Sequence, residues 1–397
     1  MPAKDELKFS STESFQLFTE GLRSLQAYGR EAKHAALERA EASLEECARK
    51  YPSDILPKFY LGIVKTERGY TGIEDAIGVF QSILEDKGEQ LKPAAEYNLA
   101  VALMRRFSSD GIKTARTILE QLDERLAHSK ESADNLALRL QVEALLNFIF
   151  VRQELWFKRY DPEFRKEQVD EARHRLDRFK KSVEDARIPE PKKQDILAAY
   201  WNAEGLIPEY LAHKAEEPKA KEQQARKAIE DFERALSLKT NWIPALSNLA
   251  RIYQDLLKRA GEAERIWMQV LEIRPDDQYA FYMRGNLYEE DNPLRAIKCF
   301  AEAPDIPEAG YKIGLAYERT RQLDKAIEQY KRVSEKDARG SLRLGEIFEQ
   351  NGDVPLALEW YKKAIKFPKA QKTVVQKAQE AVRRLEDEHL PPHQSSH

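Results

Sequence analysis

"LGEIFEQNGDVPLALEWYKKAIKFP", residues 344–368, decides the fold of this chain. Ala357 is followed by Tyr361 and Ala364 at intervals of four and three residues, and Gly345 precedes all three. Positions i, i+4 and i+7 lie on one face of a helix, so these three side chains form a single stripe that has to be buried. The small residue Gly345 predicts a preceding helix with space at its middle, so that the side chains of this stripe can pack closely against it.

The Gly352-Asp353 pair separates the two predicted helices and is typical of a connecting turn. It lacks the ligand spacing of a calcium-binding loop. Trp360 lies outside the stripe, and we expect it to cover the joint with the following helix or to lie on the surface.

The same spacing, an Ala with apolar residues four and seven positions later, occurs nine times along the chain. The sets are Ala40-Leu44-Cys47, Ala76-Phe80-Ile83, Ala115-Leu119-Leu122, Ala172-Leu176-Phe179, Ala228-Phe232-Ala235, Ala263-Trp267-Val270, Ala296-Phe300-Ala303, Ala326-Tyr330-Val333 and Ala357-Tyr361-Ala364. Successive alanines are 36, 39, 57, 56, 35, 33, 30 and 31 residues apart. The two long intervals indicate insertions at 151–170 and 207–224.

Each set is preceded by a small residue that predicts the middle of a first helix. These positions are Gly21, Gly62, Ala100, Ala144, Gly205, Ala250, Gly285, Gly314 and Gly345. The combined pattern resembles the tetratricopeptide repeat, a helix–turn–helix unit of about 34 residues. The resemblance is strongest over 243–368 and weakest over 128–240.

The resemblance implies an all-α fold, a right-handed superhelix of about nine stacked repeats. We expect N-terminal repeats at 1–127, degenerate repeats with insertions at 128–240 and C-terminal repeats at 241–368. A capping helix is expected at 369–388, and a disordered tail at 389–397.

Composition limits the classes of function. Charged residues make up 34% of the chain, with 65 basic and 68 acidic side chains thoroughly mixed. This balance argues against a general nucleic-acid binder. The two cysteines form no Cys-x-x-Cys pair, and the start "MPAKDELKFS" has no apolar segment typical of a signal peptide. We therefore expect a cytoplasmic protein without membrane insertion.

No motif predicts catalysis or a cofactor. The chain has no Gly-rich phosphate loop and no nucleophile elbow. His389, His393 and His397 are four residues apart, but Pro391 and Pro392 interrupt any helix that would align them. We expect no metal site, no cofactor and no enzymatic activity.

The segment "ELWFKRYDPEFRKE", residues 154–167, interleaves aromatic and basic side chains. Such a mixture suits base stacking and phosphate contact, but acidic residues lie among the basic ones and would repel phosphates. We favour a structural insertion, followed by a protein-binding surface and then a nucleic-acid surface.

The concave face of the superhelix, lined by first helices, is the predicted binding site. Counting from the central small residue, the solvent-facing positions supply Asn and Tyr for peptide contacts and Lys and Arg for carboxylates. The candidate residues are Asn98, Asn248, Arg251, Tyr282, Asn286, Tyr311, Lys312, Arg339 and Arg343. The carboxylate-clamp spacing of chaperone-binding repeat proteins is not reproduced.

These observations predict a protein-interaction scaffold or assembly factor that holds a segment of a partner protein. Two alternatives remain open: a regulatory sensor that compacts when a peptide binds, and a non-catalytic subunit of an enzyme complex. The sequence names neither the partner nor the oligomeric state.

Overall fold

The computed structural model describes residues 9–31, 34–85, 91–106, 108–129, 132–368 and 370–389. Every regular element in these ranges is helical, so the prediction of an all-α repeat fold is confirmed. The chain divides into two compact units, Met1–Asp277 and Gln278–His397. Our expected domain boundaries were based on how closely each segment matches the repeat pattern, and not on compact units of structure. They remain predictions. His389, the first residue of the expected disordered tail, is the last residue of helix α20, and the rest of the tail, with His393 and His397, lies outside the described residues.

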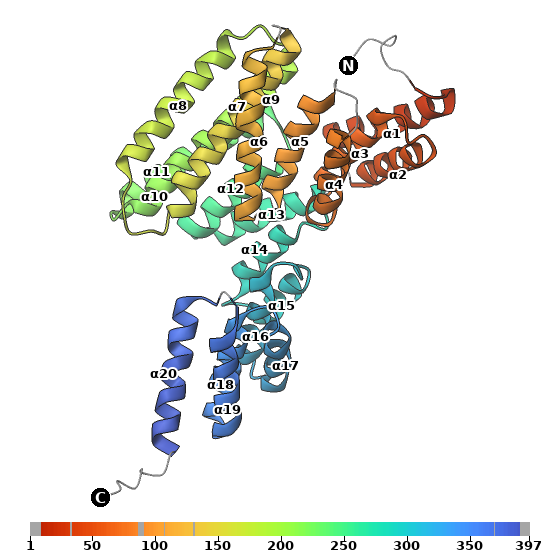
Figure 1. The fold of residues 1–397 in the computed structure, drawn as a ribbon. Coiled ribbons are helices and arrows are strands. Elements are labelled where there is room, and N and C mark those ends of the chain that lie inside the picture. The colour runs from red at the N-terminus through yellow and green to blue at the C-terminus, as the bar shows by residue number, and fades with distance from the viewer. Residues whose placement is uncertain are drawn as a thin grey trace, which may run out of the picture. The chain divides into compact units, whose positions relative to one another are not determined.

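The N-terminal unit contains six of the predicted helix pairs and one additional helix, α10 (Figure 1). Its helices are α1 (Thr12–Glu31), α2 (His34–Lys50), α3 (Ile55–Glu67), α4 (Ile73–Glu85), α5 (Lys92–Arg105), α6 (Ser109–Ala127), α7 (Ala133–Glu154), α8 (Lys166–Asp185), α9 (Glu190–Glu204), α10 (Leu206–Lys214), α11 (Pro218–Leu238), α12 (Ile243–Arg251) and α13 (Ala260–Ile273). Short 3₁₀ turns η1 (Gly69–Gly72) and η3 (Trp156–Lys158) and the π-helical turn η4 (Ile252–Leu256) interrupt them.

The C-terminal unit contains the remaining three pairs and a final helix (Figure 1). Its helices are α14 (Gln278–Tyr288), α15 (Pro293–Ala301), α16 (Pro307–Arg319), α17 (Leu323–Val333), α18 (Ala338–Gln350), α19 (Val354–Lys366) and α20 (Lys372–His389). Leu385 of α20 packs with Tyr361 of α19 in one apolar cluster, so α20 covers the last repeat.

The predicted stripe is the core of every repeat. All the residues of the nine Ala, +4 and +7 sets are buried, and the least buried, Val333, is 8% exposed. A Cβ added to Gly345 would lie 2.6 Å from the Tyr361 ring, and one added to Gly62 would lie 2.7 Å from Phe80. The small residues therefore permit the close approach that the sequence predicted.

The turn in the opening stretch shows why these helices end where they do. Gly352 adopts a φ of +79°, a left-handed conformation that ends α18 at little cost for glycine. The Asp353 side chain then accepts a hydrogen bond of 3.2 Å from the Leu356 backbone N–H and caps α19. Gly-Asp is thus a helix connector, as predicted.

Trp360 differs from its prediction. Its ring packs against the cluster of Ala326, Tyr330, Leu344 and Ile347, which joins α17 of the preceding repeat to α18, and it is not part of the cluster that contains α20. Trp360 precedes Tyr361 by one residue, which turns it about 100° away on the helix and toward the earlier repeat.

The N-terminal unit also contacts itself across a large sequence separation. Arg274, after α13, donates a hydrogen bond of 3.0 Å from Nε to the Glu67 carbonyl at the end of α3. Thr71 in η1 donates to Asp276 over 3.1 Å. In a simple stack each repeat touches only its neighbours, so these contacts show that the unit curls back on itself.

Candidate functional site

The predicted C-terminal site residues lie on the first helices α14, α16 and α18. Tyr282 and Tyr311 occupy matching positions, three residues before Gly285 and Gly314. Both rings are half-buried and lean on the second helix of their own repeat: their centroids lie 5.7 Å from those of Phe300 and Tyr330 respectively. Burial raises the pKa of both tyrosines, so both hydroxyls are protonated and able to donate at neutral pH.

Asn286 lies one turn beyond Tyr282 on α14. Its side-chain oxygen Oδ1 is buried and accepts no hydrogen bond, an unmet acceptor that costs free energy. Its nitrogen Nδ2 lies 3.8 Å from the Met283 sulfur, which is a weak acceptor. The amide therefore has bonding capacity that the repeat itself does not use.

The predicted cations are all paired with carboxylates of the chain. Lys312 pairs with Glu289, the residue that follows α14. The Arg343 Nε atom donates to Glu318 over 2.9 Å, and its Nη1 donates to Glu346 over 2.5 Å. Arg339 pairs with Asp337, which caps the same helix, and with Glu308 of α16 over 3.3 Å.

These ion pairs are partly shielded from water. The Glu318 and Glu346 carboxylates raise the pKa of Arg343, and Asp337 raises that of Arg339. The side chains of the Lys312–Glu289 and Arg343–Glu318 pairs are between 16% and 29% exposed. A carboxylate arriving from a partner would therefore have to displace an internal one.

Three carboxylates of this surface were not among the predicted site residues. Glu289, Glu318 and Glu349 each follow the central glycine of a first helix by four residues. Glu318 accepts from the Tyr330 hydroxyl over 2.6 Å, and Glu349 accepts from the Tyr361 hydroxyl over 2.7 Å. Each also pairs with a cation of the next helix on this side, Lys312, Arg343 or Arg384. The regular Gly+4 spacing is the signal that would have found them.

The predicted N-terminal residues use their side chains inside the protein. The Asn98 amide donates to the Ala94 carbonyl over 2.8 Å. The Asn248 amide donates over 2.9 Å to the side chain of Asn202, which is buried on α9. Both asparagines remain partly exposed.

Arg251 does not face the groove as we expected. It is 4% exposed and binds Glu209 of α10 through contacts of 2.7 and 2.8 Å. Its guanidinium also lies 4.7 Å from the Trp156 ring centroid. The side chain is buried because the two insertions cover it, and a single-repeat template contains neither of them.

The two insertions pack on one another. The Tyr210 hydroxyl of α10 accepts a hydrogen bond of 3.0 Å from the Arg165 backbone N–H, and its ring stacks on Phe164. Tyr160 meets His213 edge-on at 5.1 Å, and burial lowers the pKa of His213 to about 4, which keeps it neutral. These contacts are compatible with the structural role that we favoured for segment 154–167, which remains a prediction.

Two basic side chains of this segment are paired with carboxylates of the same segment. Lys158 pairs with Glu154 over 2.7 Å, and Arg165 pairs with Asp161 over 3.3 Å. Phe157, Tyr160 and Phe164 are still 50%, 68% and 52% exposed.

Other kinds of site find little support within the described ranges. There, no group of three or more His, Cys, Asp and Glu side chains could hold a metal ion. Cys47 and Cys299 are buried, and neither is part of a disulfide. In the part of the chain that the structure describes, no helix is both long and apolar enough to cross a bilayer.

Comparisons with known proteins agree with this architecture. Residues 311–371 match the family model described as tetratricopeptide repeat. The other helix pairs repeat the same close packing of a small residue on a first helix against the second helix. The matched repeats support a role in protein interaction in general terms. A comparison with curated proteins finds no match.

Solved structures with some similarity include three repeat proteins. MamA is 22% identical, with a TM-score of 0.33 over 42% of this chain and 95% of its own. YrrB, described as a TPR protein with an unusual peptide-binding site, is 21% identical, with a TM-score of 0.31 over 41% of this chain and 86% of its own. The human IFIT1 dimer with m7Gppp-AAAA is 17% identical, with a TM-score of 0.42 over 91% of each chain. None of these similarities identifies a partner for this chain.

Proposed function

We propose that this chain is a non-enzymatic protein-interaction scaffold or assembly factor. Its binding face is formed by α14, α16 and α18, and it holds an extended segment or helix of a partner protein. The observation that carries this proposal is the pair of half-buried tyrosines, Tyr282 and Tyr311, at the same position of successive repeats. Rigid aromatic side chains give large contact area at a small entropic cost.

The charged residues around the tyrosines suit selectivity more than raw affinity. Lys312 and Arg343 are held in place by Glu289 and Glu318, so a partner has to match an alternation of charges. Asn286 adds an unused oxygen that a partner N–H donor would satisfy after a rotation of the side chain. Because the helices hold this face in advance, most of the ordering cost falls on the partner.

Affinity capture from native cells, read by mass spectrometry, tests the proposal. The double variant Tyr282→Ala/Tyr311→Ala removes both rings, and we expect it to lose a partner that the wild-type chain captures. Lys325→Ala/Arg332→Ala, on the second helix α17, is the matched control and should retain that partner. Equal capture by both variants would place the binding surface elsewhere.

A further inference from the structure

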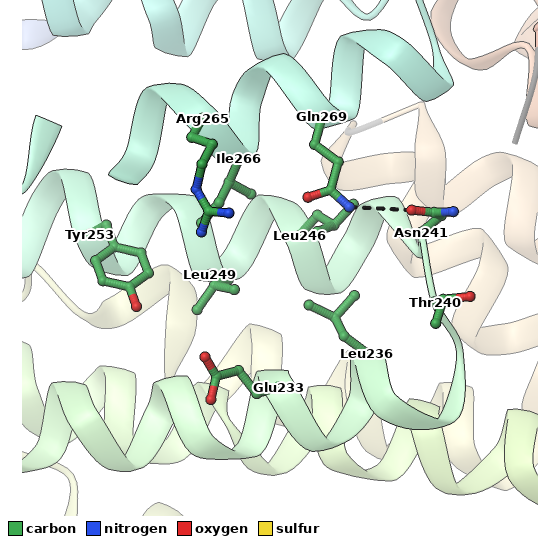
Figure 2. Close-up of a pocket in the computed structure, with 10 residues that line it drawn as sticks. All are labelled: Glu233, Leu236, Thr240, Asn241, Leu246, Leu249, Tyr253, Arg265, Ile266 and Gln269. Carbon is green, nitrogen blue, oxygen red and sulfur yellow. Dashed lines mark hydrogen bonds between the residues drawn. The ribbon is translucent and has the colours of Figure 1, made fainter. Parts of the chain in front are cut away.

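A pocket of about 330 Å³ lies in the N-terminal unit among α11, α12, η4 and α13 (Figure 2). Leu236, Leu246, Leu249 and Ile266 give it an apolar lining. Its volume is at the lower end of the range for ligand pockets and suits one large apolar side chain with its neighbours. It is open to solvent on one side.

This pocket is separate from the proposed binding face. Leu246, Leu249 and Tyr253 line it from α12 and η4. At 100° per residue they point to one side of the helix, and Asn248, the predicted groove residue, points to the other. The pocket therefore lies between the second helices α11 and α13, where the repeat pattern requires no ligand.

A break in the first helix adjoins the pocket. The Leu257 N–H donates to the Ile252 carbonyl over 3.1 Å, an i to i−5 bond that inserts an extra residue into the turn. Tyr253, on this π-helical turn, is part of the lining. Such turns are costly and are retained most often at functional sites.

Two unpaired charges of opposite sign stand at the rim. Glu233 of α11 and Arg265 of α13 are exposed, and within the described chain neither forms an ion pair or a hydrogen bond. Figure 2 shows them reaching toward Leu249 from opposite walls. This opposed pair therefore has unused capacity for recognition.

The apolar surface continues beyond the pocket. Met268, three residues after Arg265 on α13, is 41% exposed. Residues three apart share a side of a helix, so an exposed thioether lies beside the charged rim. Methionine adapts to varied apolar surfaces and is common at peptide-binding sites.

We propose that this pocket is a second docking site, which takes an amphipathic peptide segment of a partner protein. One large apolar side chain of that segment enters between Leu249 and Ile266. A basic side chain on one flank pairs with Glu233, and an acidic side chain on the other flank pairs with Arg265. The complementarity of these two charges fixes the direction in which the segment lies.

A peptide-display library with a fixed central leucine and randomised flanks, selected on the full chain, tests this proposal. We expect enrichment of peptides with one basic and one acidic flank in a constant order. Binding of the best synthetic peptide, measured by fluorescence anisotropy, should weaken about tenfold with Glu233→Arg and with Arg265→Glu. The double variant should regain affinity for a peptide in which the two charges are exchanged.

Arg226→Glu reverses the charge of an exposed side chain elsewhere on α11. It is the matched control and should leave binding unchanged. Failure to enrich the charge pattern would overturn the proposal, as would binding that is insensitive to both rim variants. Loss of binding in Tyr282→Ala/Tyr311→Ala instead would place the peptide on the first-helix face. Self-association of the chain that Arg265→Glu abolishes would identify a second copy, and not a partner peptide, as the occupant.

Discussion

Glu318 is the residue at which the contacts of the C-terminal repeats converge. Its carboxylate accepts from the Tyr330 hydroxyl of its own repeat and from the Arg343 guanidinium of the next. We expect Glu318→Gln to lower the free energy of unfolding by about 1–3 kcal/mol, because a charged acceptor of three hydrogen bonds is lost. Urea unfolding of the full chain, followed by circular dichroism, measures this.

Glu328 of α17 gives the matched control. It pairs with Arg332 over 2.5 Å, but the two side chains are 65% and 71% exposed. Glu328→Gln should therefore change the free energy of unfolding by less than about 0.5 kcal/mol. Equal effects of the two substitutions would show that Glu318 does not join the repeats.

A second prediction at this scale concerns Glu204 on α9. Burial, with Asp231 and Asp177 nearby, raises the pKa of Glu204 to about 7, and burial raises that of Asp231 to about 6. Between pH 4.5 and 7 the folded chain then binds more protons at Glu204 than the unfolded chain does. Stability contributed by this group therefore falls as pH rises through that window.

The variant Glu204→Gln isolates this effect from that of His213, which acts in the opposite direction. Relative to wild type, the variant should gain stability from pH 5 to pH 8, reaching about 1–2 kcal/mol. Glu222→Gln, on the exposed side of α11, should show no such trend. Thermal unfolding at several pH values checks this, and a constant difference for Glu204→Gln would contradict the assignment.

Local spacing predicted which apolar residues are buried, but it did not predict the burial and the ion pairs of the polar residues. The Ala, +4 and +7 sets are buried because helix periodicity alone orients them. Arg251 is buried because residues of α10 and η3, far away in the sequence, close over it. Pairing of Lys312 and Arg343 likewise depends on neighbouring repeats, whose register a single helix does not reveal.

At the scale of elements, the α3–α4 pair contains one glycine that packs against a neighbouring ring, Gly62, and one that faces open space, Gly78. A Cβ at Gly62 would meet the Phe80 ring at 2.7 Å, whereas one at Gly78 would have no neighbour within 4 Å. Gly62→Ala should destabilise the fold by about 1–3 kcal/mol through overpacking. Gly78→Ala should stabilise it by about 0.5–1 kcal/mol through helix propensity.

Thermal unfolding of both variants gives the comparison, since they lie in one repeat. A lower unfolding midpoint for Gly62→Ala, together with a higher one for Gly78→Ala, supports the close packing of α3 against Phe80 of α4. If both substitutions raise the midpoint, the first helix does not rely on a small residue at position 62.

The insertions mark the limit of prediction for elements. The long intervals between key alanines predicted where they lie, because extra residues have to fall between the fixed spacings of the repeat. Their mutual packing, through Tyr210 and Arg165, depends on contacts between segments 45 residues apart. The same holds for the contact of Arg274 with Glu67, across 207 residues.

At the scale of the whole molecule, the division between Asp277 and Gln278 predicts two independently folding parts. The C-terminal part contains three complete repeats and α20, which covers the last of them. Three repeats and a cap are enough to bury a continuous core. We expect fragments 1–277 and 278–397, expressed separately, to be helical and to unfold cooperatively.

Circular dichroism and hydrogen exchange of the fragments check this prediction. Slow exchange of amides in α16 and α18 is expected in the fragment 278–397 as in the full chain. Fast exchange throughout that fragment would mean that its repeats depend on the preceding ones for their stability.

Site-specific photo-crosslinking tests the central claim, protein binding on the first-helix face, most directly. Leu315 of α16 lies on the predicted face, and Leu323 of α17, 39% exposed, lies on a second helix of the same unit. A photoreactive phenylalanine analogue at position 315 should form a crosslink to a partner protein in native extract, and one at position 323 should not. Crosslinking from 323 alone would contradict the account.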